Sequence, residues 1–300
     1  MLNPIDLSTK AVLQTGIDFL KSPIGKFQIE NPRLEAELLL SHVLGNSRSQ
    51  MIIHSDRVIS RDALSEYEKL LEKKTTQVPT AYLLGNAEFY GRKFYVNPSV
   101  LIPRPETEEL VEWVIRSKHI ADSVLDLCTG SGCIGLTLAS EINLTYLCLS
   151  DLSTAALETV EQNTHFIRNI NSGDLNMSQL HIDIIHSDLF NDIVKKDFHL
   201  IVSNPPYVLA DEYDHLEAGV KDFEPQEALL LEKPAEFNKR LIQGAFQHLN
   251  SLGWVYLENS PVLTESLRLF FEMNGFVNIE IKKDLSGKDR FIRAQKPEKS

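Results

Sequence analysis

The sequence predicts an α/β fold in which a small helical domain precedes a doubly wound, mostly parallel sheet. From residue 123 onward, short apolar runs alternate with longer segments of helical spacing, which is the pattern of parallel strands joined by helices. Residues 276–282 and 290–294, joined across Ser286-Gly287, predict a closing antiparallel pair. Before residue 85 the spacing of apolar residues is helical.

The composition is typical of a soluble globular chain. Its 300 residues are 43% hydrophobic and 24% charged, which suits one large domain or two ordinary ones. Residues 1–10 lack the basic and then apolar pattern of a signal peptide, and no apolar run approaches membrane-spanning length. Three cysteines without a CxxC pair, and histidines without an HExxH motif, lead us to expect reduced thiols, a cytoplasmic protein and no metal site.

The net charge of −12 is concentrated in the later part of the chain. Residues 1–100 carry 12 Lys/Arg against 11 Asp/Glu, so residues 101–300 carry 18 against 31. Seven acidic residues follow position 207 closely and are opposed only by Lys221: Asp211, Glu212, Asp214, Glu217, Asp222, Glu224 and Glu227. These charges would repel a phosphate backbone, so they favour a neutral or basic polypeptide partner over DNA. The simpler alternative is a solvated acidic loop, which is common in acidic cytoplasmic proteins, but the acidic excess still weighs against DNA.

The N-terminal region is expected to be a bundle of helices. Helix caps at Ser8, at Asn31-Pro32 and at Ser60 precede segments of helical spacing, and a shorter helix is expected near residues 49–53. The region holds no phosphate loop, metal ligands or acid/base cluster. We therefore expect it to make contacts and not to perform chemistry.

A connecting region is expected between the bundle and the sheet. Residues 79–85 are interpreted as a linker, and residues 88–96, two aromatic-rich runs around Gly91, as a β-hairpin. The expected divisions of the chain are a helical domain at 1–84, a hairpin linker at 85–100 and an α/β domain at 101–300.

The elements of the α/β domain follow in order. A stiff, proline-punctuated loop at residues 101–108 opens a helix that runs through about Lys118. Parallel strands are expected at residues 123–127, 146–149, 180–186, 198–202 and 254–258. A helix that ends near Ser140 is expected after the first strand, and a helix that begins at Ser153 is expected after the second. After the fourth and fifth strands, helices are expected at residues 235–249 and 262–273.

A glycine-rich loop follows the first parallel strand, as in Rossmann-like nucleotide-binding sheets. Residues 130–135 (GSGCIG) match the dinucleotide fingerprint, and Asp151 lies 19 positions after Gly132, where its carboxylate can accept both hydroxyls of a ribose. This pattern fits NAD as well as S-adenosylmethionine. Asp126, which could face an amino-acid moiety, and Asp188, which could read an adenine edge, favour S-adenosylmethionine.

The loop after the fourth strand can hold a planar amino group. Asn204-Pro205-Pro206-Tyr207 follows a buried strand, and its prolines keep the loop extended and deny it ladder hydrogen bonds. The Asn204 side-chain oxygen and a backbone carbonyl would accept the two hydrogens of an –NH2 group, while Tyr207 packs on its plane. An ordinary Asn-Pro turn with a buried tyrosine is the simpler alternative.

Together these motifs resemble those of class I S-adenosylmethionine-dependent methyltransferases that modify amino groups. More narrowly, the chain resembles the peptide chain release factor glutamine methyltransferases along nearly its whole length. The resemblance is carried by residues 126–132 (DLCTGSG), Asp151, 187–190 (SDLF) and 204–207 (NPPY), and by 34–40 (LEAELLL), 79–85 (PTAYLLG), 88–91 (EFYG), 101–108 (LIPRPETE), 224–229 (EPQEAL) and 284–290 (DLSGKDR).

This resemblance implies a function and a set of site residues. It implies methyl transfer from S-adenosylmethionine to the side-chain amide nitrogen of the glutamine in the Gly-Gly-Gln motif of release factors, in translation termination. Substrate binding and catalysis would fall to Asn204, Pro205, Pro206 and Tyr207. The cofactor would be bound by Asp126, Cys128, Thr129, Gly130, Ser131, Gly132, Asp151, Asp188, Leu189 and Asn204. Residues 1–84 would recognise the protein substrate, and residues 101–300 would form the methyltransferase domain.

Cys128 departs from the family pattern, and three other functions have to be weighed against the one that the resemblance implies. Cys128 stands where the family usually has glycine, which predicts a slightly reshaped cofactor loop. A nucleic-acid adenine methyltransferase uses the same four-residue motif, and the negative charge disfavours it. Intact residues 204–207 disfavour a non-catalytic binding module, and a dehydrogenase would need a hydride-transfer constellation that is not evident.

Overall fold

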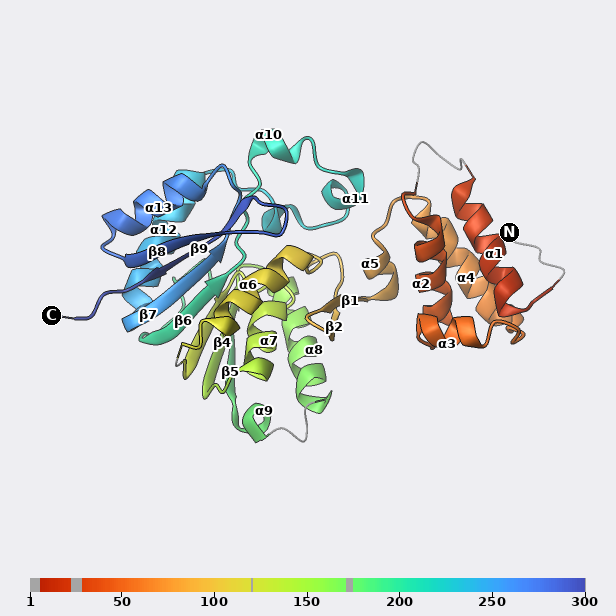
Figure 1. Cartoon of the computed structure of the whole chain (residues 1–300), viewed down its shortest axis with the longest axis horizontal. Coiled ribbons are helices and arrows are strands. Elements are labelled where there is room, and N and C mark those ends of the chain that lie inside the picture. Colours follow the sequence, from red (N-terminus) through yellow and green to blue (C-terminus); the bar gives the residue numbers. More distant parts are fainter. Residues whose placement is uncertain (1–5, 23–28, 120, 171–174, 300) are drawn as a thin grey trace. The chain divides into compact units, whose positions relative to one another are not determined.

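The computed structural model describes residues 6–22, 29–119, 121–170 and 175–299. The chain divides into two compact units (Figure 1). The first combines Met1–Gly85 with Glu217–Phe223, and the second combines Asn86–Leu216 with Glu224–Ser300. Among the described residues, no helix has the length and apolar character needed to cross a bilayer.

The first unit is a bundle of helices around an apolar core. Its elements are α1 (Thr9–Lys21), α2 (Pro32–Val43), α3 (Arg48–Ile53), α4 (Arg61–Lys74), α5 (Thr80–Leu84) and α11 (Ala218–Lys221). The side chains of Ser8 and Ser60 accept hydrogen bonds from the backbone N–H three residues further on, which confirms these two predicted caps. Val12, Leu39 and Tyr67 lie fully buried in the core.

The linker predicted at residues 79–85 is wrong, because Thr80–Leu84 form the short helix α5. Pro79 precedes this helix, and Gly85 ends it with a left-handed φ of +67°. Five residues are too few to show a helical spacing of apolar side chains, so only the proline and the glycine were visible as signals.

The second unit begins with a hairpin and continues into the main sheet. β1 (Asn86–Phe89) and β2 (Arg92–Tyr95) pair antiparallel around Gly91, where the sequence predicts a hairpin. The main sheet contains β3 (Ser123–Leu127), β4 (Tyr146–Asp151), β5 (His181–His186), β6 (Phe198–Ser203), β7 (Leu249–Glu258), β8 (Val277–Lys283) and β9 (Asp289–Gln295).

The order of the main sheet is β5-β4-β3-β6-β7-β9-β8. The first five strands in this order are parallel, whereas β9 is antiparallel to β7 and to β8. This confirms the predicted doubly wound sheet with an antiparallel end. The chain runs outward from β3 to β5 and then returns to β6 beside β3, which makes β3/β6 the switch point where such sheets bind ligands.

Helices cover both faces of the sheet (Figure 1). α6 (Pro105–Arg116), α7 (Cys133–Glu141) and α8 (Thr154–Ile170) lie on one face, and α12 (Pro234–His248) and α13 (Thr264–Met273) lie on the other. Neighbouring strand residues alternate between the two cores: Leu200 and Val202 of β6 belong to the first, and Ile201 belongs to the second.

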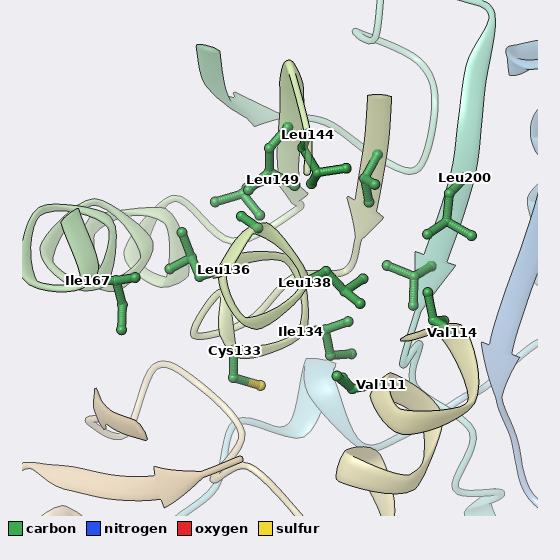
Figure 2. Packing of buried hydrophobic residues seen from close by; sticks show 14 of the residues in the cluster. Val111, Val114, Cys133, Ile134, Leu136, Leu138, Leu144, Leu149, Ile167 and Leu200 are labelled. Atoms are coloured by element: carbon green, nitrogen blue, oxygen red, sulfur yellow. The ribbon is translucent and has the colours of Figure 1, made fainter. Parts of the chain in front are cut away.

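α7 is packed on several sides, which holds the loop before it in place. Figure 2 shows its Ile134 near Val111 of α6 and its Leu136 turned toward Ile167 of α8. Seven of its nine residues are buried. A helix buried all round in this way is a fixed support for the glycine-rich loop that leads into it.

Several boundaries differ from the prediction. β7 begins at Leu249, five residues before the predicted start, and continues through Leu252, which has a φ of +64°. The polar residues between 249 and 254 conceal this extension. The short elements α9 (Leu175–Gln179), α10 (Ala210–Tyr213), α11 and η1 (Gln226–Ala228) were not predicted, because three to five residues carry no readable period.

Candidate active site

A cavity of about 740 Å³ lies at the carboxyl ends of β3, β4, β5 and β6. Its walls come from the loops after these four strands, from the segment before and at the start of α6, and from the loop before α12. The volume is in the range of small-molecule and cofactor sites. The predicted site residues that line it are Cys128, Thr129, Gly130, Ser131, Asp151, Asp188, Leu189, Asn204 and Pro206. Asp126, Gly132, Pro205 and Tyr207 lie outside this lining.

The loop between β3 and α7 turns through three left-handed residues. Cys128, Gly130 and Gly132 have φ angles of +57°, +56° and +80°. Glycine adopts this conformation without strain, whereas a cysteine side chain does so at a cost of about 1–3 kcal/mol. Cys128 thus keeps the left-handed backbone conformation that suits a glycine, and its side chain is strained there. The reshaping of the cofactor loop stays a prediction.

We expect Cys128→Val to lower the free energy of unfolding by about 1–3 kcal/mol, because a β-branched residue fits φ angles above zero poorly. Cys128→Gly should stay within about 1 kcal/mol of the parent, since relief of strain offsets the lost packing of the thiol. Urea denaturation of both variants measures this difference. A valine variant as stable as the glycine variant would contradict the strain.

Asp126 lies beneath this loop. Its side chain is fully buried, and its Oδ2 accepts hydrogen bonds from Thr129 Oγ1 (2.6 Å) and from the backbone N–H of Gly135 (2.8 Å). Burial raises the pKa of Asp126 to about 7, and these two hydrogen bonds act in the opposite direction. Its Oδ1 is buried without a partner among the described residues. The Asp126 side chain therefore joins the loop to the first turn of α7.

Gly135 allows α7 to approach β3 and β4 closely. A Cβ atom at this position would lie 2.5 Å from Leu149 Cδ2 and 3.0 Å from the Asp126 side chain. Any larger residue would push the helix or the Asp126 carboxylate away. The third glycine of the fingerprint thus serves close packing of helix and sheet.

Asp151, at the end of β4, lines the cavity and also holds the loop. Its Oδ2 accepts a hydrogen bond from Gly130 N and its Oδ1 accepts one from Ser153 N, both at 2.9 Å. Burial raises the pKa of this carboxyl group, and the backbone hydrogen bonds lower it. A carboxylate has about four acceptor positions, so both oxygens can accept further hydrogen bonds from a ligand.

Asp188, after β5, is paired with a residue that the sequence analysis did not single out. Its Oδ2 accepts a hydrogen bond from Arg240 Nη2 of α12 at 2.7 Å. The following residue, Leu189, is left-handed (φ +53°), and its carbonyl accepts a hydrogen bond from Ser187 Oγ (2.8 Å). Leu189 lines the cavity at this tight turn.

Asn204 reaches the cavity from the end of β6 and is held from behind. Its Nδ2 donates to Thr107 Oγ1 (3.1 Å), and Thr107 Oγ1 donates to Glu258 Oε2 (2.8 Å). Tyr207 O–H donates to the other oxygen of Glu258 (2.9 Å). Burial raises the pKa of Glu258 and also that of Tyr207. Arg290 lies over the Tyr207 ring, 5.8 Å from its centroid.

The proline-rich segment before α6 is fastened to the loop before α12. Glu224 accepts hydrogen bonds from Arg104 Nη2 (2.6 Å) and from the backbone N–H of Ile102 (3.1 Å), and its side chain is only 1% exposed. A parallel bridge between Val208 and Leu230 closes the base of the loop. Glu224 therefore belongs to the frame of the cavity and not to an exposed acidic surface.

Similarities to known proteins extend over both units of the chain. A release factor glutamine methyltransferase of Leptospira interrogans is 38% identical over 289 residues, covering 95% of this chain and 97% of the relative. The enzyme of the same name from Aliivibrio fischeri is 33% identical, covering 97% and 98%. The chain belongs to the release factor glutamine methyltransferase family. The family's two parts are recognisable: residues 11–85 match the PrmC N-terminal domain, and residues 107–219 match the Methyltransferase small domain.

The solved structures agree with the fold of this family. A methyltransferase from Pyrococcus furiosus superposes with a TM-score of 0.50 at 16% identity, over 75% of this chain and 99% of that one. At this identity the likeness shows the fold alone. The relatives at 38% and 33% identity confirm the family resemblance seen in the sequence.

Proposed function

We infer that this protein transfers a methyl group from S-adenosylmethionine to the side-chain amide nitrogen of the glutamine in the Gly-Gly-Gln motif of peptide chain release factors. The observation that carries this function is the orientation of Asn204 at the cavity. Its Nδ2 is engaged by Thr107, which leaves its Oδ1 to accept a hydrogen bond from an amide N–H of the substrate.

The residues around the cavity fit S-adenosylmethionine. Asp151 would accept the ribose hydroxyls with its remaining lone pairs, and the Asp188-Leu189 turn would hold the adenine. Residues 128–131 would hold the amino-acid end, close to the unpaired Asp126 Oδ1 that lies under the loop. When bound, the cofactor supplies an electrophilic methyl group on a positively charged sulfur.

The chain's own contribution is to bind and orient a weak nucleophile. The lone pair of an amide nitrogen is delocalised into its carbonyl, so reaction requires alignment and stabilisation of the positive charge that develops on nitrogen. We assign Asn204 Oδ1 and the Pro205 carbonyl to the two N–H groups. Pro206 and Tyr207 would hold the plane of the amide.

The first unit would supply the second contact with the protein substrate. A three-residue motif offers far less surface than specific protein recognition needs, which is about 800 Å² per partner. The region 1–84 carries no chemical motif of its own. We therefore propose that it recognises the release factor, that residues 85–100 connect it to the reaction site, and that residues 101–300 perform the transfer.

The acidic segment after Tyr207 would receive basic residues near the target glutamine. Six of its acids are exposed, namely Asp211, Glu212, Asp214, Glu217, Asp222 and Glu227. Their charge disfavours direct binding of nucleic acid.

The three cysteines are free, in keeping with a protein that acts in the cytoplasm.

Raising the salt concentration from 0.05 to 0.5 M should therefore weaken release factor binding several-fold and change cofactor binding little, because exposed charges are screened. Fluorescence anisotropy with a labelled release factor, beside calorimetry with the cofactor, measures both. Equal salt sensitivity of the two affinities would contradict an electrostatic role for the acidic segment.

The proposed function is tested with isotopically labelled S-adenosylmethionine, a release factor and, separately, duplex DNA. Mass spectrometry then locates the label. A single methyl group on the glutamine of the Gly-Gly-Gln motif is the expected result. Label found only on adenine would show that the substrate is DNA and not a release factor, while methyl transfer to an amino group would still hold. Cofactor binding without transfer to either would favour a binding module.

A further inference from the structure

Four polar side chains form a continuous hydrogen-bonded chain at the cavity, and two of them, Thr107 and Asn204, line it. Tyr207 and Thr107 both donate to the carboxylate of Glu258, and Thr107 accepts from Asn204. Thr107 lies in the first turn of α6 and Glu258 at the end of β7, so the chain joins two elements to the loop after β6. Thr107 and Glu258 are 2% and 1% exposed.

The direction of every hydrogen bond in this chain follows from Glu258. Burial raises the pKa of Glu258, whereas the hydrogen bonds from Thr107 and Tyr207 and the charge of Arg290 lower it and favour the ionised carboxylate. An ionised carboxylate only accepts, so Thr107 uses its single hydroxyl hydrogen on Glu258. The hydroxyl oxygen can then only accept from Asn204, which must present its NH2 group to Thr107. The amide of Asn204 has two ends, and the other end, the carbonyl oxygen, is thereby directed to the cavity.

We propose that Thr107 and Glu258 are positioning residues that fix the orientation of the Asn204 amide, so that its oxygen and not its NH2 group meets the substrate. The inference rests on the proposed function, in which the target glutamine amide donates its N–H groups to Asn204. If Asn204 presented its own NH2 group instead, two donors would face each other and no hydrogen bond could form. Glu258 also places a negative charge behind the group that meets the developing positive charge. Tyr207, Arg290 and Glu106 are the charged or titratable groups that act on it.

The first test compares Thr107→Val with Thr107→Ser. Valine keeps the shape of threonine and can neither donate nor accept, whereas serine keeps the hydroxyl. We expect Thr107→Val to lower kcat by about 10- to 100-fold, with KM for the release factor and the affinity for S-adenosylmethionine unchanged. Thr107→Ser should recover most of this loss. A valine variant with turnover within twofold of the parent would overturn the proposal, as would a serine variant impaired equally.

The second variant, Glu258→Gln, keeps the size of the side chain and adds a donor. Its NH2 group can donate to Thr107, which can then donate onward and turn the amide of Asn204 around. We expect kcat to fall by about tenfold or more, again at unchanged cofactor affinity. A fully active Glu258→Gln enzyme would overturn the role of the carboxylate in setting the direction.

An NMR measurement tests the orientation independently of activity. In protein with ¹⁵N-labelled asparagine, the side-chain amide signal of Asn204 is assigned by its loss in Asn204→Asp. Hydrogen exchange of this NH2 group should be slow in the parent and at least about tenfold faster in Thr107→Val. Unchanged exchange would overturn the proposal. This measurement needs no substrate, so it tests the orientation of Asn204 separately from the methylation reaction. Failure of the parent protein to methylate a release factor would reject the proposed function and leave the orientation of Asn204 standing.

Discussion

Replacing Asn204 with alanine is expected to lower kcat by about a hundredfold or more, the size of loss seen when one aligned polar group is removed from a reaction site. The alanine side chain cannot accept the N–H of the target amide, so the nitrogen loses its alignment with the methyl group. Cofactor binding should change much less, because the loop after β3 and Asp151 are intact in this variant.

Single-turnover methylation of a release factor and calorimetric titration with S-adenosylmethionine separate these two effects. Asn191→Ala is a matched control, since Asn191 is exposed and lies outside the cavity lining. Near-normal turnover of Asn204→Ala with normal cofactor affinity would show that Asn204 is not the acceptor of the target amide.

The second large effect is expected at Asp151. Asp151→Ala removes the acceptor proposed for the ribose hydroxyls and also releases the backbone of Gly130 and Ser153. Hydrogen bonds to a charged group contribute about 1.5–3 kcal/mol each, so we expect the affinity for S-adenosylmethionine to fall by about a hundredfold.

Asp151→Asn should not restore this affinity. Both carboxylate oxygens accept backbone N–H groups, and the NH2 end of an asparagine would face one of these donors. Calorimetry with S-adenosylmethionine and S-adenosylhomocysteine measures the loss, with the exposed Asp192→Asn as control. An affinity within threefold of the parent in Asp151→Ala would remove Asp151 from the cofactor site.

The main elements of the second unit could be predicted because their signals are local. Each strand is a short apolar run, and each long helix repeats its apolar residues often enough to be recognised. The order of the strands is not local, and α5, α9, α10, α11 and η1 have too few residues for a readable period. These features became visible only in the structure.

The same distinction applies to the site. The positions of Asp151 and Asn204 after their strands follow from short motifs. Thr107, the partner of Asn204, precedes it by 97 positions. Glu258, the partner of Thr107, follows Thr107 by 151 positions. Arg240 is likewise 52 positions from Asp188. Motifs within one loop therefore indicate which groups meet the ligand, whereas the groups that hold them depend on tertiary packing.

The first unit is discontinuous in the sequence, because Glu217–Phe223 belongs to it together with Met1–Gly85. During synthesis, this last piece leaves the ribosome roughly 140 residues after Gly85, which takes about 7–30 s at common elongation rates. The buried apolar core of the bundle nevertheless lies entirely within residues 12–71, so this core can form before α11 is made. A fragment that stops at Gly85 would therefore contain this whole core and would lack only α11 and its flanking residues.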